Sequence, residues 1–198
     1  MSLFLKFHNP LLRKVSKEIS LNLTSSKETE KVIQRMLKIA FGQQKDNKKP
    51  IMVGLAAPQI GTSKRIILVD VAADGKGKVG DLKIFINPEI TWKSDKKNEW
   101  YEGCYSIPGI CGVVSRPITI KVKGVMNVEQ KYTGYVGRIF QHEIDHLNGK
   151  LFVDKISDPN KLHRVKKSEF ALYRNNEGWR NWPKKYPLPL ANTKLKKV

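Results

Sequence analysis

The nine residues Gln141-His142-Glu143-Ile144-Asp145-His146-Leu147-Asn148-Gly149 decide how this chain is interpreted. They contain the pattern HExxH at the end of a predicted helix that begins near Tyr135 and ends at the Asn-Gly pair. Residues four apart lie on one face of a helix, so His142 and His146 can bind one metal ion. Glu143 follows the first histidine and can exchange a proton with an attacking water. The pattern therefore favours a metal-dependent hydrolase over two structural histidines.

A third protein ligand is needed, because HExxH supplies two and a catalytic metal site usually has three. Phe152 stands where one class of zinc protease has a third histidine, which disfavours that class. A downstream carboxylate could serve instead, and Glu169 and Glu177 lie in a basic, irregular stretch. Cys104 is the favoured candidate, because a thiolate is a strong, soft ligand and its segment is rich in turn-forming residues. Cys111 fits better as a small core residue.

The rest of the 198-residue chain predicts one α+β domain. We expect a capped helix over 25–42, strands over 65–70, 82–90 and 118–123, and a polar, basic loop over 44–50. Two cysteines cannot form a disulfide scaffold and indicate a reducing compartment. The sequence predicts no secretory signal peptide, and no apolar run approaches the ~20 residues that span a bilayer.

The charge of the chain is strongly positive, with 37 Lys and Arg against 18 Asp and Glu, a net charge of +19. This excess favours an anionic partner, namely nucleic acid, the ribosome or a membrane surface, although a basic protein can also simply be soluble. We expect a catalytic domain over residues 1–160 and a basic C-terminal tail over 161–198. The tail cations are Lys161, Arg164, Lys166, Lys167, Lys184, Lys185, Lys194, Lys196 and Lys197.

Three segments together resemble the peptide deformylase family. They are Val53-Gly54-Leu55-Ala56-Ala57-Pro58-Gln59, Glu102-Gly103-Cys104-Tyr105-Ser106 and the nine residues quoted above, in the order and at the separation of that family. The stretch from His8 to Val15 resembles the start of the family, so we expect Met1 onward to be mature protein rather than a transit peptide. The resemblance reaches about Asp154 and leaves out the tail.

The resemblance implies antiparallel β-sheets around a central helix that carries HExxH. It implies hydrolysis of the N-formyl group from the formyl-methionine of nascent polypeptides, in a bacterial cytoplasm or alternatively in an organelle. It also implies one divalent metal ion, usually Fe(2+), with zinc, nickel or cobalt as substitutes.

The resemblance also implies a role for individual residues. Matched by position, Cys104, His142 and His146 are the metal ligands and Glu143 is the acid/base. The side chain of Gln59 and the backbone N–H of Tyr105 would stabilise the oxyanion, and the backbone of Gly54 would hold the substrate as an added strand.

Two positions depart from the family pattern. Met52 replaces a glycine, and we expect its side chain to lie beside the peptide-binding edge and raise KM. Tyr105 replaces a leucine and should matter less, because its backbone acts. The alternatives are a deformylase-like binding module with weak or lost activity, and a metallopeptidase. Finally, Arg116 and Asp145 are expected either to pair or to remain solvated charges.

Overall fold

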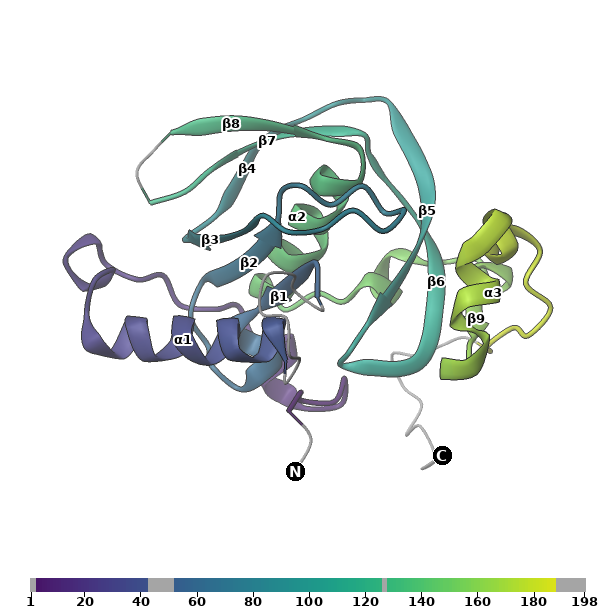
Figure 1. The fold of residues 1–198 in the computed structure, drawn as a ribbon, viewed down its shortest axis with the longest axis horizontal. Coiled ribbons are helices and arrows are strands. Elements are labelled where there is room, and N and C mark those ends of the chain that lie inside the picture. Colours follow the sequence, from purple (N-terminus) through teal and green to yellow (C-terminus); the bar gives the residue numbers. More distant parts are fainter. Residues whose placement is uncertain (1–2, 43–51, 126–127, 188–198) are drawn as a thin grey trace. The chain divides into compact units, whose positions relative to one another are not determined.

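The computed structural model describes residues 3–42, 52–125 and 128–187 (Figure 1). The predicted loop over 44–50 and the last three tail lysines lie outside these ranges. The chain forms two compact units: residues 1–97 with 116–150, and residues 98–115 with 151–198. The domain boundary expected near residue 160 stays a prediction.

The first unit begins with the predicted helix. Helix α1 (Lys27–Phe41) starts at Ser26, whose hydroxyl accepts a hydrogen bond from the Thr29 N–H, and ends at Gly42, where φ is 64°. A positive φ suits glycine, because it has no Cβ to clash with the backbone. The apolar face of α1, with Met36 and Ile39, packs in one core cluster with Leu55, Ile66 and Leu68.

Two three-stranded antiparallel sheets complete the first unit. One has the order β1 (Gly54–Ala56), β2 (Ile66–Asp70), β3 (Leu82–Ile86), and the other β4 (Glu89–Lys93), β7 (Thr119–Lys123), β8 (Glu129–Thr133). The single strand predicted over 82–90 is therefore two strands in different sheets. Asn87, at φ 49°, and the following Pro88 separate them.

Helix α2 (Gly134–Leu147) carries HExxH and contacts strands of both sheets. Figure 1 shows α2 between β2 and the β7–β8 pair. Ile139, Phe140, Ile144 and Leu147 are buried in a cluster with side chains from β2 and β7. This arrangement confirms the expected α+β fold of antiparallel sheets around a central helix.

The second unit contains most of the long strands β5 (Lys97–Cys104) and β6 (Ile107–Pro117), which form a sheet with β9 (Leu162–Arg164). The short helix α3 (Phe170–Arg174) follows, and Tyr173, Trp179 and Trp182 are buried with residues of β6.

The two units also contain short 3-10 helices, which lie at Pro10–Arg13, Leu21–Leu23, Ala57–Ile60, Phe152–Lys155, Pro159–Lys161, Lys167–Glu169 and Asn175–Asn181. Within the described ranges, no helix is both long enough and apolar enough to cross a membrane.

Candidate metal centre and active site

The two histidines of HExxH lie one turn apart on α2, as predicted. Their ring centroids are 5.1 Å apart and their planes cross at 75°. His146 is 1% exposed, whereas His142 is only partly buried. Neighbouring imidazoles of this kind suit a divalent metal that takes nitrogen ligands. The two histidines therefore fit the metal site that the sequence predicts.

Glu143 lies directly against strand β1. A Cβ added to Gly54 would be 2.5 Å from the Glu143 Oε1 and 2.8 Å from the Ile139 Cγ2, so only glycine fits between strand and helix. Glu143 is 5% exposed. The first unit therefore brings together the expected acid/base and the residue expected to hold the substrate backbone.

Gln59 is buried and held in one orientation. It belongs to the 3-10 helix Ala57–Ile60 that follows β1, and its Oε1 accepts a hydrogen bond of 2.8 Å from the Ala56 N–H. This bond uses the oxygen end of the amide, so the NH₂ end is directed elsewhere. An NH₂ donor fixed in this way suits stabilisation of an oxyanion.

Arg116 and Asp145 form a buried ion pair, which confirms the pairing rather than the solvated alternative. The Arg116 Nη1 lies 2.7 Å from the Asp145 Oδ2, and the two side chains are 3% and 14% exposed. Asp145 stands between the two histidines on the helix. The pair therefore fixes the end of β6 to the part of α2 that carries HExxH.

Gln141 has a role that the sequence did not reveal. Its Nε2 donates to the Pro117 carbonyl at 3.0 Å and to the Gly137 carbonyl at 3.1 Å. Gln141 precedes Asp145 by one helical turn, so the two side chains bind consecutive residues of β6. The one sequence signal for this role is the spacing, because Gln141 and Asp145 are four residues apart on the predicted helix.

In the second unit, Cys104 is the last residue of β5, and Tyr105 and Ser106 form the turn to β6. Cys104 is partly buried, and the Tyr105 side chain is 52% exposed. Cys111 lies in the core of this unit, as expected. Burial raises the pKa of the Cys111 thiol to about 12, which keeps it protonated and unsuited to metal binding.

The two downstream carboxylates considered as ligands are engaged with cations. Glu177 accepts bonds of 2.5 and 3.0 Å from Arg180, and Glu169 pairs with Lys184. Each carboxylate thus already has a cationic partner at the surface of the second unit.

The expected position of the Met52 side chain was wrong. Its side chain is 4% exposed and belongs to the core cluster that includes Met36 and Ile39 of α1. The methionine therefore fills the core beneath the first sheet and does not narrow a groove beside β1. Met52 precedes β1 by two residues and lies outside any strand, so the sequence did not show whether its side chain enters the core or faces the edge of β1.

An HExxH helix between antiparallel sheets, with its glutamate against an edge strand, is the framework of a metal-dependent hydrolase. Comparison with known proteins identifies the family within this class. The family described as polypeptide deformylase matches residues 1–162. A peptide deformylase of Pelotomaculum thermopropionicum is 44% identical over 141 residues, which cover 69% of this chain and 86% of the relative. A peptide deformylase of Halothermothrix orenii is 39% identical over 76% of this chain and 90% of its own length.

Solved structures agree. A Met-Ala-Ser-bound class I type b peptide deformylase of Acinetobacter baumannii has a TM-score of 0.68 and 31% identity, covering 79% of this chain and 100% of its own. The peptide deformylase of Thermotoga maritima has a TM-score of 0.64 and 34% identity, covering 80% and 99%. The chain belongs to the polypeptide deformylase family. It is a metal-dependent deformylase, and the metallopeptidase and binding-module alternatives are not favoured.

Proposed function

We propose that the chain removes the N-formyl group from the formyl-methionine of nascent polypeptides, with Cys104, His142 and His146 holding one Fe(2+) ion. The observation that carries the proposal is the position of Glu143, buried on the HExxH helix and pressed against Gly54 of β1. Formylated chains arise where bacterial-type translation occurs, so the site of action would be a bacterial cytoplasm, with an organelle as the alternative.

The three proposed ligands offer one sulfur and two ring nitrogens. A thiolate beside two imidazoles suits Fe(2+) as well as zinc, nickel or cobalt, because all four accept soft and borderline donors. When bound, the metal would lower the pKa of a water molecule and polarise the formyl carbonyl. Cys111 is no competitor, because its thiol stays protonated in the core.

The protein side chains would supply the rest of the chemistry. Glu143 would accept a proton from the attacking water and pass it to the amine that leaves. The NH₂ of Gln59 and the backbone N–H of Tyr105 would donate hydrogen bonds to the charge that develops on the formyl oxygen. Gln59 is suited to this role because the Ala56 N–H fixes its carbonyl end.

Strand β1 would bind the substrate backbone. It pairs with β2 on one side and is the terminal strand of its sheet over the described residues. An extended peptide can add to such an edge through main-chain hydrogen bonds. The similar Acinetobacter baumannii enzyme has been solved with Met-Ala-Ser bound, which is the kind of product that deformylation yields.

The proposal is tested by formate release and metal content. Cys104→Ala should lower bound metal sharply and abolish formate release from formyl-Met-Ala-Ser, because only two protein ligands remain. Cys111→Ala is the matched control and should keep both. Protein purified without oxygen should contain iron. Cleavage of unformylated Met-Ala-Ser, or full activity in Cys104→Ala, would contradict the proposal.

We also propose that the basic tail brings the enzyme to ribosomes. Among the described residues, Arg164, Lys166, Lys167, Lys184 and Lys185 are exposed cations of this segment. Binding to ribosomal RNA through such cations should weaken steeply with salt, because bound counterions are released. Co-sedimentation at low salt should be lost when Lys166 and Lys167 become Gln. Lys121→Gln and Lys123→Gln, which lie in β7, form the matched control.

A further inference from the structure

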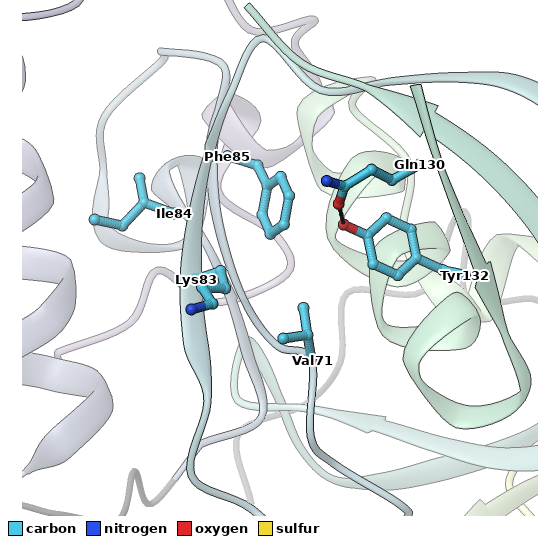
Figure 2. Close-up of a pocket in the computed structure, with 6 residues that line it drawn as sticks. All are labelled: Val71, Lys83, Ile84, Phe85, Gln130 and Tyr132. Atoms are coloured by element: carbon cyan, nitrogen blue, oxygen red, sulfur yellow. Dashed lines mark hydrogen bonds between the residues drawn. The ribbon is translucent and has the colours of Figure 1, made fainter. Parts of the chain in front are cut away.

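The first unit contains a pocket of about 360 Å³ that none of the proposed catalytic residues lines. Its lining residues are Val71, Lys83, Ile84, Phe85, Gln130 and Tyr132. Figure 2 shows Phe85 of β3 and Tyr132 of β8 facing the same space, with Val71 below them. Strands β3 and β8 are terminal strands of their sheets over the described residues, so the pocket lies where the two sheets open.

The floor of the pocket is aromatic. The rings of Phe85 and Tyr132 meet edge to face with centroids 6.3 Å apart. Both rings also pack on Phe140 of α2, at 4.7 and 4.2 Å between centroids. Such a floor accepts an apolar or aromatic group without burying unpaired polar atoms.

Helix α2 separates this pocket from the histidines. Phe140 precedes His142 by two residues, which corresponds to a rotation of about 200° around a helix. The face of α2 that supports the pocket is therefore opposite the face that carries the first histidine. A molecule bound in the pocket would not occupy the catalytic site.

The polar groups of the pocket favour an anion. The Tyr132 hydroxyl donates a hydrogen bond of 2.5 Å to the Gln130 Oε1. This bond leaves the NH₂ of Gln130 as the donor end, and Figure 2 shows it on the side toward Phe85. Lys83 lies at the rim with its side chain 57% exposed and its Nζ 2.8 Å from the Asp81 Oδ1. An exposed pair of this kind contributes little, so Lys83 can exchange Asp81 for a ligand carboxylate.

We propose that this pocket binds a small monocarboxylate with an apolar, preferably aromatic, body. The apolar body packs on Phe85 and Tyr132. The carboxylate lies at the rim, where the ammonium group of Lys83 pairs with it in place of Asp81. A pocket of this volume is at the lower end of the range that binds small ligands.

The test uses 4-phenylbutyrate and its neutral amide with the full-length, metal-loaded enzyme. Calorimetry gives both dissociation constants, and amide chemical shifts in NMR spectra locate the bound molecule. The acid should bind with a dissociation constant on the order of 1 mM. It should bind about 3- to 5-fold more tightly than the amide, as expected for one partly exposed charge pair.

Three variants test the position and the chemistry. Lys83→Gln should make acid and amide bind equally, whereas Lys121→Gln in β7 should keep the preference for the acid. Val71→Trp fills the pocket and should abolish binding of both while deformylation stays at the wild-type rate. Equal binding of acid and amide by the wild type would overturn the assignment of a carboxylate. Shift changes confined to the surroundings of His142, or wild-type binding by Val71→Trp, would overturn the site.

Discussion

Helix α2 and the C-terminal segment over residues 162–186 bury different kinds of side chain. On and around α2, charged and polar groups are buried at Arg138, Gln141, Glu143 and His146. The C-terminal segment instead buries Tyr173, Trp179, Trp182 and Tyr186, and nearly all of it lies beyond residue 162, where the family match ends.

This difference indicates that α2 serves the reaction, whereas the C-terminal segment serves the stability of the fold. Buried polar groups lower stability unless they are paired, so a protein that buries several of them on one helix does so for function. Buried aromatic rings contribute large apolar areas and no acid–base chemistry. Substitutions on α2 should therefore change turnover most, and substitutions in the C-terminal segment should change stability most.

Glu143→Gln should give the largest effect. The amide cannot accept a proton from water, so turnover of a formylated peptide should fall by ~10²–10⁴-fold while metal content and unfolding are unchanged. Glu169→Gln, which removes a half-buried carboxylate of the second unit that pairs with Lys184, is the control and should leave turnover unchanged. Near-normal turnover by Glu143→Gln would mean that another group transfers the proton.

Trp179→Ala tests the other side of the comparison. Trp179 is 1% exposed and lies among Trp100 and Tyr101, with ring centroids 6.0 and 6.4 Å away. Its loss should lower the free energy of unfolding of the second unit by about 3–5 kcal/mol. Urea unfolding followed by near-ultraviolet circular dichroism measures this change.

Leu172→Ala is the matched control for Trp179→Ala, because Leu172 is an apolar residue of the same segment and is 69% exposed. It should change stability by less than about 0.5 kcal/mol. The kcat/KM of Trp179→Ala, measured at a temperature where this variant remains folded, should equal the kcat/KM of the wild type. A large fall in kcat/KM without unfolding would show that the C-terminal segment takes part in the reaction.

The pair of Arg116 and Asp145 sharpens the comparison, because it places a stabilising interaction on α2 itself. Asp145→Asn leaves the buried guanidinium without its carboxylate and should lower the free energy of unfolding by about 3 kcal/mol. Glu129→Gln, which breaks an exposed pair with Lys121, should lower it by less than about 1 kcal/mol. Both are measured by urea unfolding at equal metal occupancy, because bound metal adds stability. Equal effects of the two variants would contradict a buried role for the pair.

The candidate site on α2 could be predicted from the sequence because its geometry is local. A separation of four residues places His142 and His146 on the same face of a helix, one turn apart, without knowledge of the fold. The same reasoning directs Asp145 away from the metal, but its pairing with Arg116 of β6 was only one of two alternatives that the sequence left open.

The sheet of the second unit could not be predicted in this way. Strands β5 and β6 contain Gly103, Pro108, Gly109 and Gly112, which are typical of turns, so the local sequence predicts a turn where the structure has two long strands. Pairing over a long separation in the chain, such as that of Cys111 in β6 with His163 in β9, stabilises these strands. Local propensity does not contain this information. The same reason explains why the sequence placed the side chain of Met52 incorrectly.

His163 is an exception to the aromatic character of the C-terminal segment, and it offers a weaker test of the comparison. It is 1% exposed, and its Nδ1 lies 2.9 Å from the Tyr173 hydroxyl while its Nε2 lies 2.8 Å from the Asn160 carbonyl. Burial raises the pKa of Tyr173, so its hydroxyl remains a donor, to Nδ1. Nε2 therefore carries the proton and donates to Asn160, which is the arrangement of a neutral imidazole.

Protonation of His163 should therefore destabilise the second unit. Burial, together with the nearby charge of Lys185, lowers the pKa of His163 below its value of 6.5 in an unfolded chain. Below pH 6.5 the unfolded chain binds this proton more readily than the folded chain does, so the free energy of unfolding should fall as the pH falls. The contribution of the neutral histidine to stability should be fully present above pH 6.5. Tryptophan fluorescence during urea unfolding reports the change, since Trp179 and Trp182 belong to this unit. His163→Gln should reduce the slope of stability between pH 7 and pH 5.5, whereas His8→Gln should retain it. If the two variants have the same slope as the wild type, the buried histidine does not titrate in this range and the C-terminal segment is purely an apolar structure.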